Sequence, residues 1–350
     1  MRVFVAGGSG AVGRPVVRML AARGHEVVAT TRSATKAKLL RAAGATAVVV
    51  DGLDAAAIGE VVARAEPDAI VHQMSALGGA PDMRRFDRWF AATNALRTRG
   101  TENLLAAARA SGVGRFVAQS YTGWTNAHDG SPVKTEEDAL DPRPARSQRE
   151  TFAAVRYLER AVLGAPLQGT ILRYGNFYGP EASEALLGLV RRRRLPIIGT
   201  GAGVWSWIHV DDAAAATVAA VERGPRGVFN VVDDEPAPVS EWLPFLAEVL
   251  GAPAPRRIPR WLGYLAAGEA ATRWMTEGRG ASNRRARWEL AWEPRWRSWR
   301  EGFRSGLSDR PMAGAGSQGP HAGGGFDGAP SQPAHDPRTP NGPQRPQGAE

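Results

Sequence analysis

Short runs of β-branched and aromatic residues alternate with longer stretches of helical periodicity, and this alternation limits the folds open to the chain. The runs cover residues 2–7, 26–31, 46–51, 68–74, 115–120 and 170–175. Each run is apolar on both faces, which is typical of a parallel strand covered by helices on both sides. We therefore predict an α/β fold with a doubly wound parallel sheet.

The first predicted strand leads directly into the glycine-rich turn AGGSGAVG. Glycine permits a tight turn, lets backbone amides approach a pyrophosphate, and lets the next helix pack closely. The N-terminus of that helix also favours phosphate groups. Because the turn joins a strand to an amphipathic helix, we predict a dinucleotide site formed by Gly7, Ser9, Gly10, Ala11, Val12 and Gly13.

The second predicted strand ends in ATTRSATK and carries no acidic residue there to bind a ribose hydroxyl. Thr31 and Arg32 stand at its end, and Lys36 follows one turn later. A guanidinium pairs well with a phosphate, so the sequence favours NADP over NAD. An ordinary surface role for Arg32 stays open.

The third predicted strand ends in VVVDGLD. Asp51 has the chemistry to accept a hydrogen bond from an adenine amino group, with Gly52 and Leu53 beside the ring. A simple turn at the end of a strand explains the same residues, and the sequence does not separate the two interpretations.

The pattern changes after residue 175, where segments become shorter and proline and glycine more frequent. We expect a smaller substrate lobe built mainly from residues 175–205 and 230–307, joined to the nucleotide-binding part within 1–307. Residues 308–350 contain almost no large apolar side chains, so we expect a disordered tail rich in proline and glycine. The chain has no cysteine and its histidines are scattered, so we expect no metal site.

The net charge is +9, with 44 arginine and lysine residues against 35 acidic ones. No helix-turn-helix or RNA-binding motif accompanies the charge, so we expect a surface that attracts small anionic substrates rather than nucleic acid. No apolar run is long enough to span a membrane, and a strand begins at residue 2. We expect a cytoplasmic protein, and a homodimer is compatible with the sequence.

Several motifs in a fixed order resemble the extended short-chain dehydrogenase/reductase superfamily of the NAD-dependent epimerase/dehydratase type. The resemblance covers residues 1–307. Its motifs are the glycine turn, VHQMSA (71–76), Asn94 in ATNALRTRGTENLL, RFVAQS (115–120), LRYGNFYGP (172–180), WIHVDDAAAA (207–216), VFNVVDDEP (228–236) and ASNRRARWELAWEP (281–294).

The resemblance implies a seven-stranded Rossmann-type sheet and a C-terminal substrate lobe. It implies that His72, Gln73 and Met74 line the cofactor and that Asn94 belongs to the cofactor site. It further implies that Tyr174 and Gly175 border the nicotinamide, and that Asn176 and Tyr178 face the substrate cleft. Packing roles remain open for each of these residues.

Members of this family carry a Tyr-x-x-x-Lys pair on the helix after the fifth strand, and this chain lacks it. No lysine occurs from residue 135 to 350, and the two registers we derive place the tyrosine at Arg146 or at Thr151. Ser120 and Tyr121 are the substitutes that the sequence offers for proton transfer. Tyr121 could instead pack on the cofactor or line the cleft together with Trp124.

The sequence therefore predicts an NAD(P)-dependent oxidoreductase or epimerase/dehydratase-like protein with atypical acid/base residues. Its expected substrate is a small carbonyl or alcohol compound, or a sugar-type compound. The alternative is a catalytically silent protein that senses a dinucleotide or binds a partner.

Overall fold

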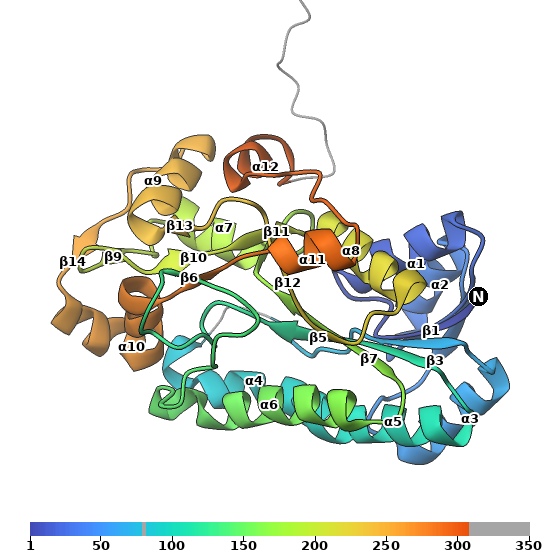
Figure 1. Cartoon of the computed structure of the whole chain (residues 1–350). Helices are drawn as coiled ribbons and strands as arrows, with labels where there is room; N and C mark the ends of the chain where they lie inside the picture. Colours follow the sequence, from blue (N-terminus) through green and yellow to red (C-terminus); the bar gives the residue numbers. More distant parts are fainter. Residues whose placement is uncertain (79–81, 308–350) are drawn as a thin grey trace, which may run out of the picture. The chain divides into compact units, whose positions relative to one another are not determined.

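A seven-stranded parallel sheet forms the centre of the protein in the computed structural model, which describes residues 1–78 and 82–307 (Figure 1). Its strand order is β12-β7-β5-β4-β1-β2-β3. The doubly wound α/β prediction is confirmed, and each predicted run supplies one strand. The strands are β1 (Arg2–Ala6), β2 (Glu26–Thr31), β3 (Thr46–Val49), β4 (Ala69–His72), β5 (Arg115–Tyr121), β7 (Gln168–Tyr174) and β12 (Gly227–Val231).

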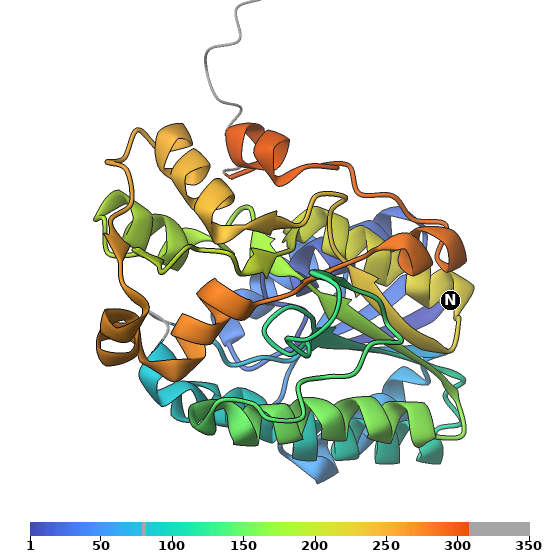
Figure 2. The same cartoon turned by 60° about the vertical axis from the view of Figure 1, so that its left-hand side comes forward.

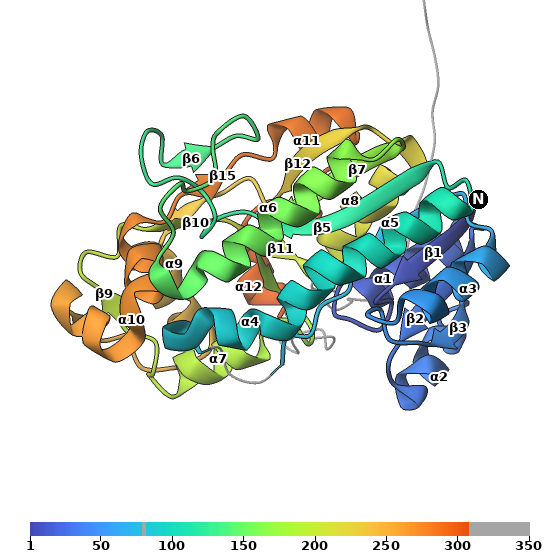
Figure 3. The ribbon, with the colours of Figure 1, turned by 90° about the horizontal axis from the view of Figure 1, so that it is seen from below.

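Helices cover both faces of the sheet, which explains why its strands are apolar on both sides. One face carries α1 (Gly13–Ala22), α2 (Ala34–Ala42) and α8 (Val210–Arg223). The other face carries α3 (Ala55–Ala65), α5 (Thr101–Ala110) and α6 (Arg149–Gly164), which Figure 3 shows from below the sheet together with α4 (Phe86–Ala95).

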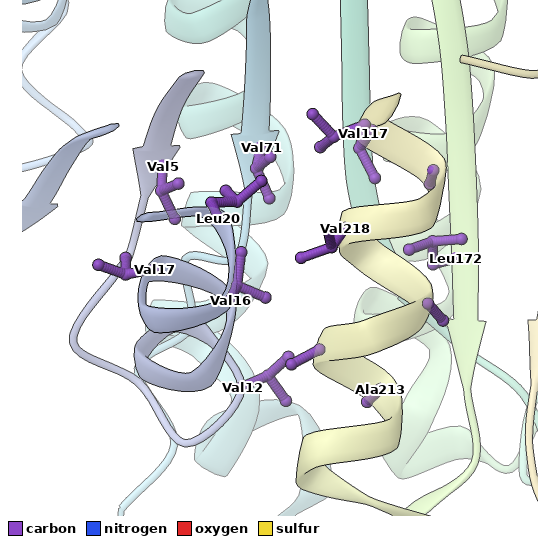
Figure 4. Close-up of a cluster of buried hydrophobic side chains, with 14 of the residues drawn as sticks. Val5, Val12, Val16, Val17, Leu20, Val71, Val117, Leu172, Ala213 and Val218 are labelled. Atoms are coloured by element: carbon purple, nitrogen blue, oxygen red, sulfur yellow. The ribbon is translucent and has the colours of Figure 1, made fainter. Parts of the chain in front are cut away.

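The packing of α1 against α8 fixes the position of the glycine turn. Figure 4 shows Val12, Val16 and Leu20 on the side of α1 that faces Val218 of α8 and the strands. Val16, Leu20 and Val218 are fully buried in one continuous apolar cluster. The start of α1 is therefore held rigidly at the end of β1.

The direction of chain progression reverses between β1 and β4. From β1 the chain proceeds to β2 and β3 on one side, and from β4 to β5, β7 and β12 on the other. In open parallel sheets, ligands bind at the carboxyl ends of the strands at such a reversal. The glycine turn follows β1 and therefore lies at that point.

The helical stretch after Asn94 is interrupted. A π-helical segment, η2 (Leu96–Gly100), separates α4 from α5, where the 3.6-residue pattern alone suggests one regular helix. π-Helical turns are rare and are frequent at functional sites.

A second group of elements lies beyond the carboxyl ends of the strands, and we call it the C-terminal lobe (Figure 2). Its core contains Trp205, Trp207, Trp242 and Trp299, all at most 5% exposed. Its helices are α7 (Glu184–Arg191), α9 (Val239–Val249), α10 (Arg260–Glu277) and α12 (Trp299–Ser305), whereas α11 (Arg284–Glu289) packs against β12 of the central sheet. Its short strands are β8 (Asn176–Tyr178), β9 (Ile197–Ile198), β10 (Val204–Trp205), β11 (Trp207–His209), β13 (Ala237–Pro238) and β14 (Arg257–Ile258).

Four short elements connect the lobe to the rest of the structure. They are η1 (Met83–Arg85), β6 (Val133–Lys134), η3 (Arg146–Gln148) and β15 (Gly280–Ala281). The strands β6 and β15 pair with each other and join the loop after β5 to the segment after α10. The disordered tail expected at 308–350 lies outside the described residues.

Candidate functional site

Backbone atoms pack closely within the glycine turn after β1, and the Gly10 amide donates a hydrogen bond to the Gly7 carbonyl. Gly7 adopts φ +83°, and a Cβ there would lie 2.7 Å from the carbonyl carbon of Gln73. A Cβ on Gly13 would collide with the carbonyl oxygen of Gly7. A Cβ on Gly10 would meet only that same oxygen, at 3.5 Å. The fold of the turn therefore requires Gly7 and Gly13, whereas Gly10 leaves space beside the turn.

Backbone amides at the start of α1 have no acceptor in the described part of the chain. Val12 caps the helix without a side-chain hydrogen bond, and no acidic residue follows in the first turn. The amides of Ser9, Ala11, Val12 and Gly13 donate to none of the described residues. Unpaired amides at a helix N-terminus bind phosphate oxygens well. The turn therefore fits the diphosphate of a dinucleotide.

Hydroxyl groups and cations meet at the end of β2. The Ser9 Oγ and Thr31 Oγ1 atoms lie 2.8 Å apart, and the Ser33 amide donates to Thr31 Oγ1 at 3.2 Å. Arg32 and Lys36 are exposed, and neither forms an ion pair with a residue in 1–78 or 82–307. These two cations are available to a ligand that binds along the turn.

The turn after β3 has a clear packing role. The Asp51 Oδ1 atom accepts a hydrogen bond from the Leu53 amide at 3.0 Å. Gly52 is buried, and a Cβ there would collide with the sulfur of Met74. The Gly52 carbonyl accepts a hydrogen bond from the Asn103 side chain at 3.0 Å. The adenine contacts of Asp51 and Leu53 stay a prediction.

Two side chains at the end of β4 point into the protein rather than toward a cofactor. The His72 ring is fully buried and lies 3.1 Å from Thr101 Oγ1. Burial lowers the pKa of His72 to about 4, so the ring is neutral at pH 7. Met74 packs against Gly52 and Gly100. We therefore correct the expected roles of His72 and Met74: only their backbone atoms remain candidates for lining the cofactor.

Gln73, between these two residues, faces the other side of the sheet. Its Nε2 donates to the Tyr174 hydroxyl at 2.9 Å, and that hydroxyl lies 2.7 Å from Thr217 Oγ1. Its Oε1 is buried and has no hydrogen-bond partner among the described residues. The Tyr174 side chain is 1% exposed, so only its backbone can border a nicotinamide. Gly175 is required because a Cβ there would lie 2.7 Å from the Ser206 carbonyl oxygen.

Tyr121 and Asn176 come together at the ends of β5 and β7. The Tyr121 hydroxyl donates to Asn176 Oδ1 at 2.6 Å, and Asn176 Nδ2 donates to the Ser206 carbonyl at 3.0 Å. The Tyr121 ring stacks on Trp124 with a centroid distance of 5.1 Å. Burial raises the pKa of the Tyr121 phenol, so the phenol keeps its proton at neutral pH. These residues form the polar centre of the candidate site.

Ser120 does not join that centre. Its hydroxyl donates to Glu159 Oε1 at 2.7 Å, and Glu159 forms a buried two-point ion pair with Arg173, at 2.8 and 2.6 Å. Ser120 therefore faces α6 and supports a buried charged cluster. We correct its expected catalytic role to a structural one.

The inner side of α6 carries no acid/base pair. Thr151, in the predicted tyrosine register, donates to Asp87 Oδ1 at 2.7 Å and accepts from Asn94 Nδ2 at 3.0 Å. Val155, in the corresponding lysine register, is buried among aromatic residues. Asn94 thus orients Thr151, and its own Oδ1 is buried without a partner in the described protein.

The tyrosine of α6 faces away from the site. The Tyr157 hydroxyl donates to Glu102 Oε1 of α5 at 2.5 Å near the surface. Arg146, the other predicted register, lies in η3 and is exposed. The structure thus offers no Tyr-x-x-x-Lys pair in either register.

Sequence reasoning missed one charged residue next to the site. Arg97, in η2, is 8% exposed, and its guanidinium lies 5.3 Å from the centroid of the Phe90 ring. A signal was available, because Phe86, Phe90, Thr93 and Arg97 follow the helical spacing of an apolar stripe. An arginine on such a stripe is unusual, since buried charges need partners.

Aromatic residues form two separate clusters. One contains Phe86, Phe90, Trp124 and Phe152, and the partly buried Tyr121 packs against it. Tyr178 belongs to the other, in the C-terminal lobe, where a Cβ on Gly302 would collide with its hydroxyl. We therefore correct the expected cleft role of Tyr178, which is a core residue, and retain Trp124 beside Tyr121.

No group of three or more histidine, cysteine, aspartate or glutamate side chains in the described residues is arranged to hold a metal ion. No helix in this part of the chain is long and apolar enough to cross a membrane.

Several known proteins are similar to this chain. A family model described as "NAD dependent epimerase/dehydratase family" matches residues 3–231. A Streptomyces protein, "3-diazoavenalumate denitrifying reductase", is 44% identical over 314 residues, covering 87% of this chain and 99% of that protein. A Stigmatella aurantiaca protein, "4-hydroxy-2-methyl-3-oxo-4-farnesyl-3,4-dihydroquinoline-1-oxide ketoreductase", is 30% identical and covers 73% of this chain and 75% of its own.

A solved structure shows the same architecture. The Thermus thermophilus UDP-glucose 4-epimerase in complex with NAD is 26% identical and superposes with a TM-score of 0.66. The match covers 87% of this chain and 97% of that one.

Proposed function

Because this chain belongs to the NAD-dependent epimerase/dehydratase family and is an NAD(P)-dependent enzyme of the oxidoreductase/epimerase type, we propose that it is a reductase that removes a diazo group from an aromatic substrate. The name of the Streptomyces relative describes the reductive removal of nitrogen from a diazo compound. That relative and this chain match over nearly their whole lengths.

The observation that carries the proposal is the absence of an acid/base pair on α6. In one of the two predicted registers Thr151 and Val155 occupy the two positions, and both are buried. In the other register Arg146 occupies the tyrosine position. Reduction of a carbonyl to an alcohol needs a proton as well as a hydride, so such an enzyme gains from a general acid. When bound, the reduced nicotinamide supplies a hydride. Transfer of a hydride to an arenediazonium cation, followed by loss of dinitrogen, gives a neutral arene and consumes no proton.

This reaction is balanced without any further reactant. The substrate cation accepts two electrons and one hydrogen nucleus, a C–H bond replaces the C–N bond, and dinitrogen leaves. The protein therefore has to bind, align and exclude water, and these tasks fit the residues at the site. The Tyr121–Asn176 pair is fixed by hydrogen bonds at 2.6 and 3.0 Å.

The aromatic cluster supports an aromatic substrate. Trp89 and Tyr121 are two of the partly buried residues that pack against it, and their rings contact the buried rings of Phe90 and Trp124. Ring faces of this kind stack on arenes and attract cations. An arenediazonium ion combines both properties.

We further propose NADPH as the cofactor, in preference to NADH. The unpaired Arg32 and Lys36 at the end of β2, beside the hydroxyls of Ser9 and Thr31, suit an added phosphate. No acidic side chain stands in that segment to bind a bare ribose diol.

The test uses the full-length protein, deuterated NADPH and a carboxylated arenediazonium salt as the probe. The expected result is enzyme-dependent loss of NADPH absorbance with deuterium in the arene product, detected by mass spectrometry. A Gly13→Val variant, whose turn cannot close, gives the background reaction. Equal rates with the wild-type protein and this variant would refute the proposal.

Carbonyl reduction is the second candidate, because the Stigmatella relative is named a ketoreductase. In that case Tyr121 would be the proton donor, since its raised pKa keeps the phenol protonated. A panel of ketones in the same assay separates the two candidates: turnover of ketones but not of the diazonium probe would favour this one.

A further inference from the structure

Arg97 is a buried cation without a partner. It is 8% exposed, and its guanidinium makes no hydrogen bond or ion pair with any residue in the described ranges. Its Nη1 atom in particular is fully enclosed and unpaired. The guanidinium lies over the face of Phe90 at 5.3 Å, and the charge of Glu159 acts on it without a direct ion pair.

The nearest carboxylate is already occupied. Glu159 uses both oxygens for Arg173 and Ser120, at distances of 2.6 to 2.8 Å. The histidine on the other side, His72, is neutral at pH 7 because burial lowers its pKa to about 4. The formal charges of Arg97, Glu159 and Arg173 sum to +1, and the partly buried Glu136 also interacts electrostatically with Arg173.

An unpaired buried cation is costly, and buried charges in native proteins are as a rule paired or hydrogen-bonded. Burial lowers the pKa of Arg97 to about 10, and the nearby charge of Glu159 offsets only part of this shift. The π-helical turn places Arg97 where it is, between α4 and α5, and such turns are frequent at functional sites.

The position of Arg97 indicates which part of a ligand it would meet. Its segment touches the end of β4, where Gly100 lies against Met74, and the neighbouring Gln73 backbone closes the glycine turn. Phe90, under the guanidinium, belongs to the aromatic cluster that also holds Tyr121 and Val155. The segment of Arg97 thus contacts a residue next to the strand end that borders the glycine turn. It also packs against α6, and Phe90 connects it to the aromatic cluster that contains Val155.

We propose that Arg97 binds acceptor oxygens of the nicotinamide half of the dinucleotide, its ribose hydroxyls and adjoining phosphate, in place of a cation on α6. This rests on the cofactor part of the proposed function. Arg97 is then a positioning residue, which holds the nicotinamide ring beside Tyr121 and Asn176.

The test compares Arg97→Met with Arg99→Met, an exposed arginine of the same π-helical segment, as the matched control. Affinities for NADPH and for 2′,5′-ADP, which lacks the nicotinamide half, are measured by calorimetry. Thermal unfolding is recorded with and without NADPH. Arg97→Met should weaken NADPH binding by about 10- to 100-fold and leave 2′,5′-ADP binding unchanged. Its ligand-free melting temperature should equal or exceed that of the wild type.

Arg97→Lys should restore part of the NADPH affinity, because it restores the charge but not the planar fork. Three outcomes would overturn the inference. The first is NADPH binding by Arg97→Met equal to that of Arg99→Met. The second is an equal loss of ligand-free stability and of affinity for both ligands, which would show a purely structural role. The third is unchanged NADPH binding with a raised KM for the diazonium probe, which would assign Arg97 to a substrate carboxylate.

The proposed function fails in a distinguishable way. If the wild-type protein bound neither NADPH nor NADH, the cofactor assignment itself would be wrong. If the wild-type protein binds NADPH and Arg97→Met binds it equally well, only the inference about Arg97 is wrong.

Discussion

The candidate site at the carboxyl ends of the strands has two halves, and they present different groups to a ligand. At β1 to β3 the surface offered to a ligand is mainly backbone, with amides and glycines held by the packing of α1 on α8. At β5 and β7 it consists of side chains, with Tyr121 bonded to Asn176 and α6 contributing only packing residues. We call the ends of β1 to β3 the binding half and the ends of β5 and β7 the reacting half. The binding half keeps the glycine-turn motif of the family, whereas the reacting half lacks the Tyr-x-x-x-Lys pair of the family.

The largest expected effect comes from a substitution that disrupts the glycine turn in the binding half. Gly13→Val should abolish NADPH binding and lower stability, because even a Cβ at this position collides with the Gly7 carbonyl oxygen. Calorimetry and thermal unfolding measure the two effects. Gly10→Ala is the control for folding, since its Cβ has space, and it should retain the wild-type melting temperature. A Gly13→Val protein that bound NADPH normally would contradict the closed-turn description.

The next largest effect is a loss of stability on breaking the buried Glu159–Arg173 ion pair, which involves β7 of the reacting half. Glu159→Ala leaves Arg173 buried without its partner and should cost roughly 3–5 kcal/mol of unfolding free energy. Denaturant unfolding measures this cost. Glu60→Ala breaks an exposed pair with Arg64 and should cost about 0–1 kcal/mol. Similar losses in the two variants would show that the cluster at Glu159 is not structural.

Cofactor preference gives a smaller effect in the binding half. Arg32→Ala should weaken NADPH binding by roughly 1.5–3 kcal/mol, the usual range for a hydrogen bond to a charged group, and leave NADH binding almost unchanged. Titration with both dinucleotides measures the difference. Lys38→Ala, which removes an exposed cation of the following helix α2, is the control. Equal losses for NADPH and NADH would contradict the phosphate role of Arg32.

The smallest expected effect concerns the polar centre. Tyr121→Phe removes the phenol, and reduction of the diazonium probe should stay within about threefold of the wild-type rate, since no proton transfer is required. Any ketone turnover should fall by about 10²- to 10⁴-fold if Tyr121 is the acid. A large loss of diazonium reduction at unchanged NADPH affinity would contradict the acid-free mechanism.

The sequence predicted the strands and the backbone of the binding half better than it predicted the roles of individual side chains. Six strands and the glycine turn were predictable, because apolar runs and glycines act locally, and the resemblance to the family implied the seventh strand. The roles of four side chains were not predictable, because each is set by a partner that is distant in the sequence. Ser120 contacts Glu159 and His72 contacts Thr101. Met74 packs against Gly52 and Tyr178 against Gly302. Arg97 was missed although its spacing placed it on the buried stripe of α4.

The most direct test of the central claim is a pair of isotope effects on diazonium reduction by the wild-type protein. We predict a primary isotope effect with deuterated NADPH and no solvent isotope effect in D₂O beyond that of viscosity, because the hydride moves and no proton does. A substantial solvent isotope effect that disappeared in Tyr121→Phe would show that the protein supplies a proton, and would contradict the account.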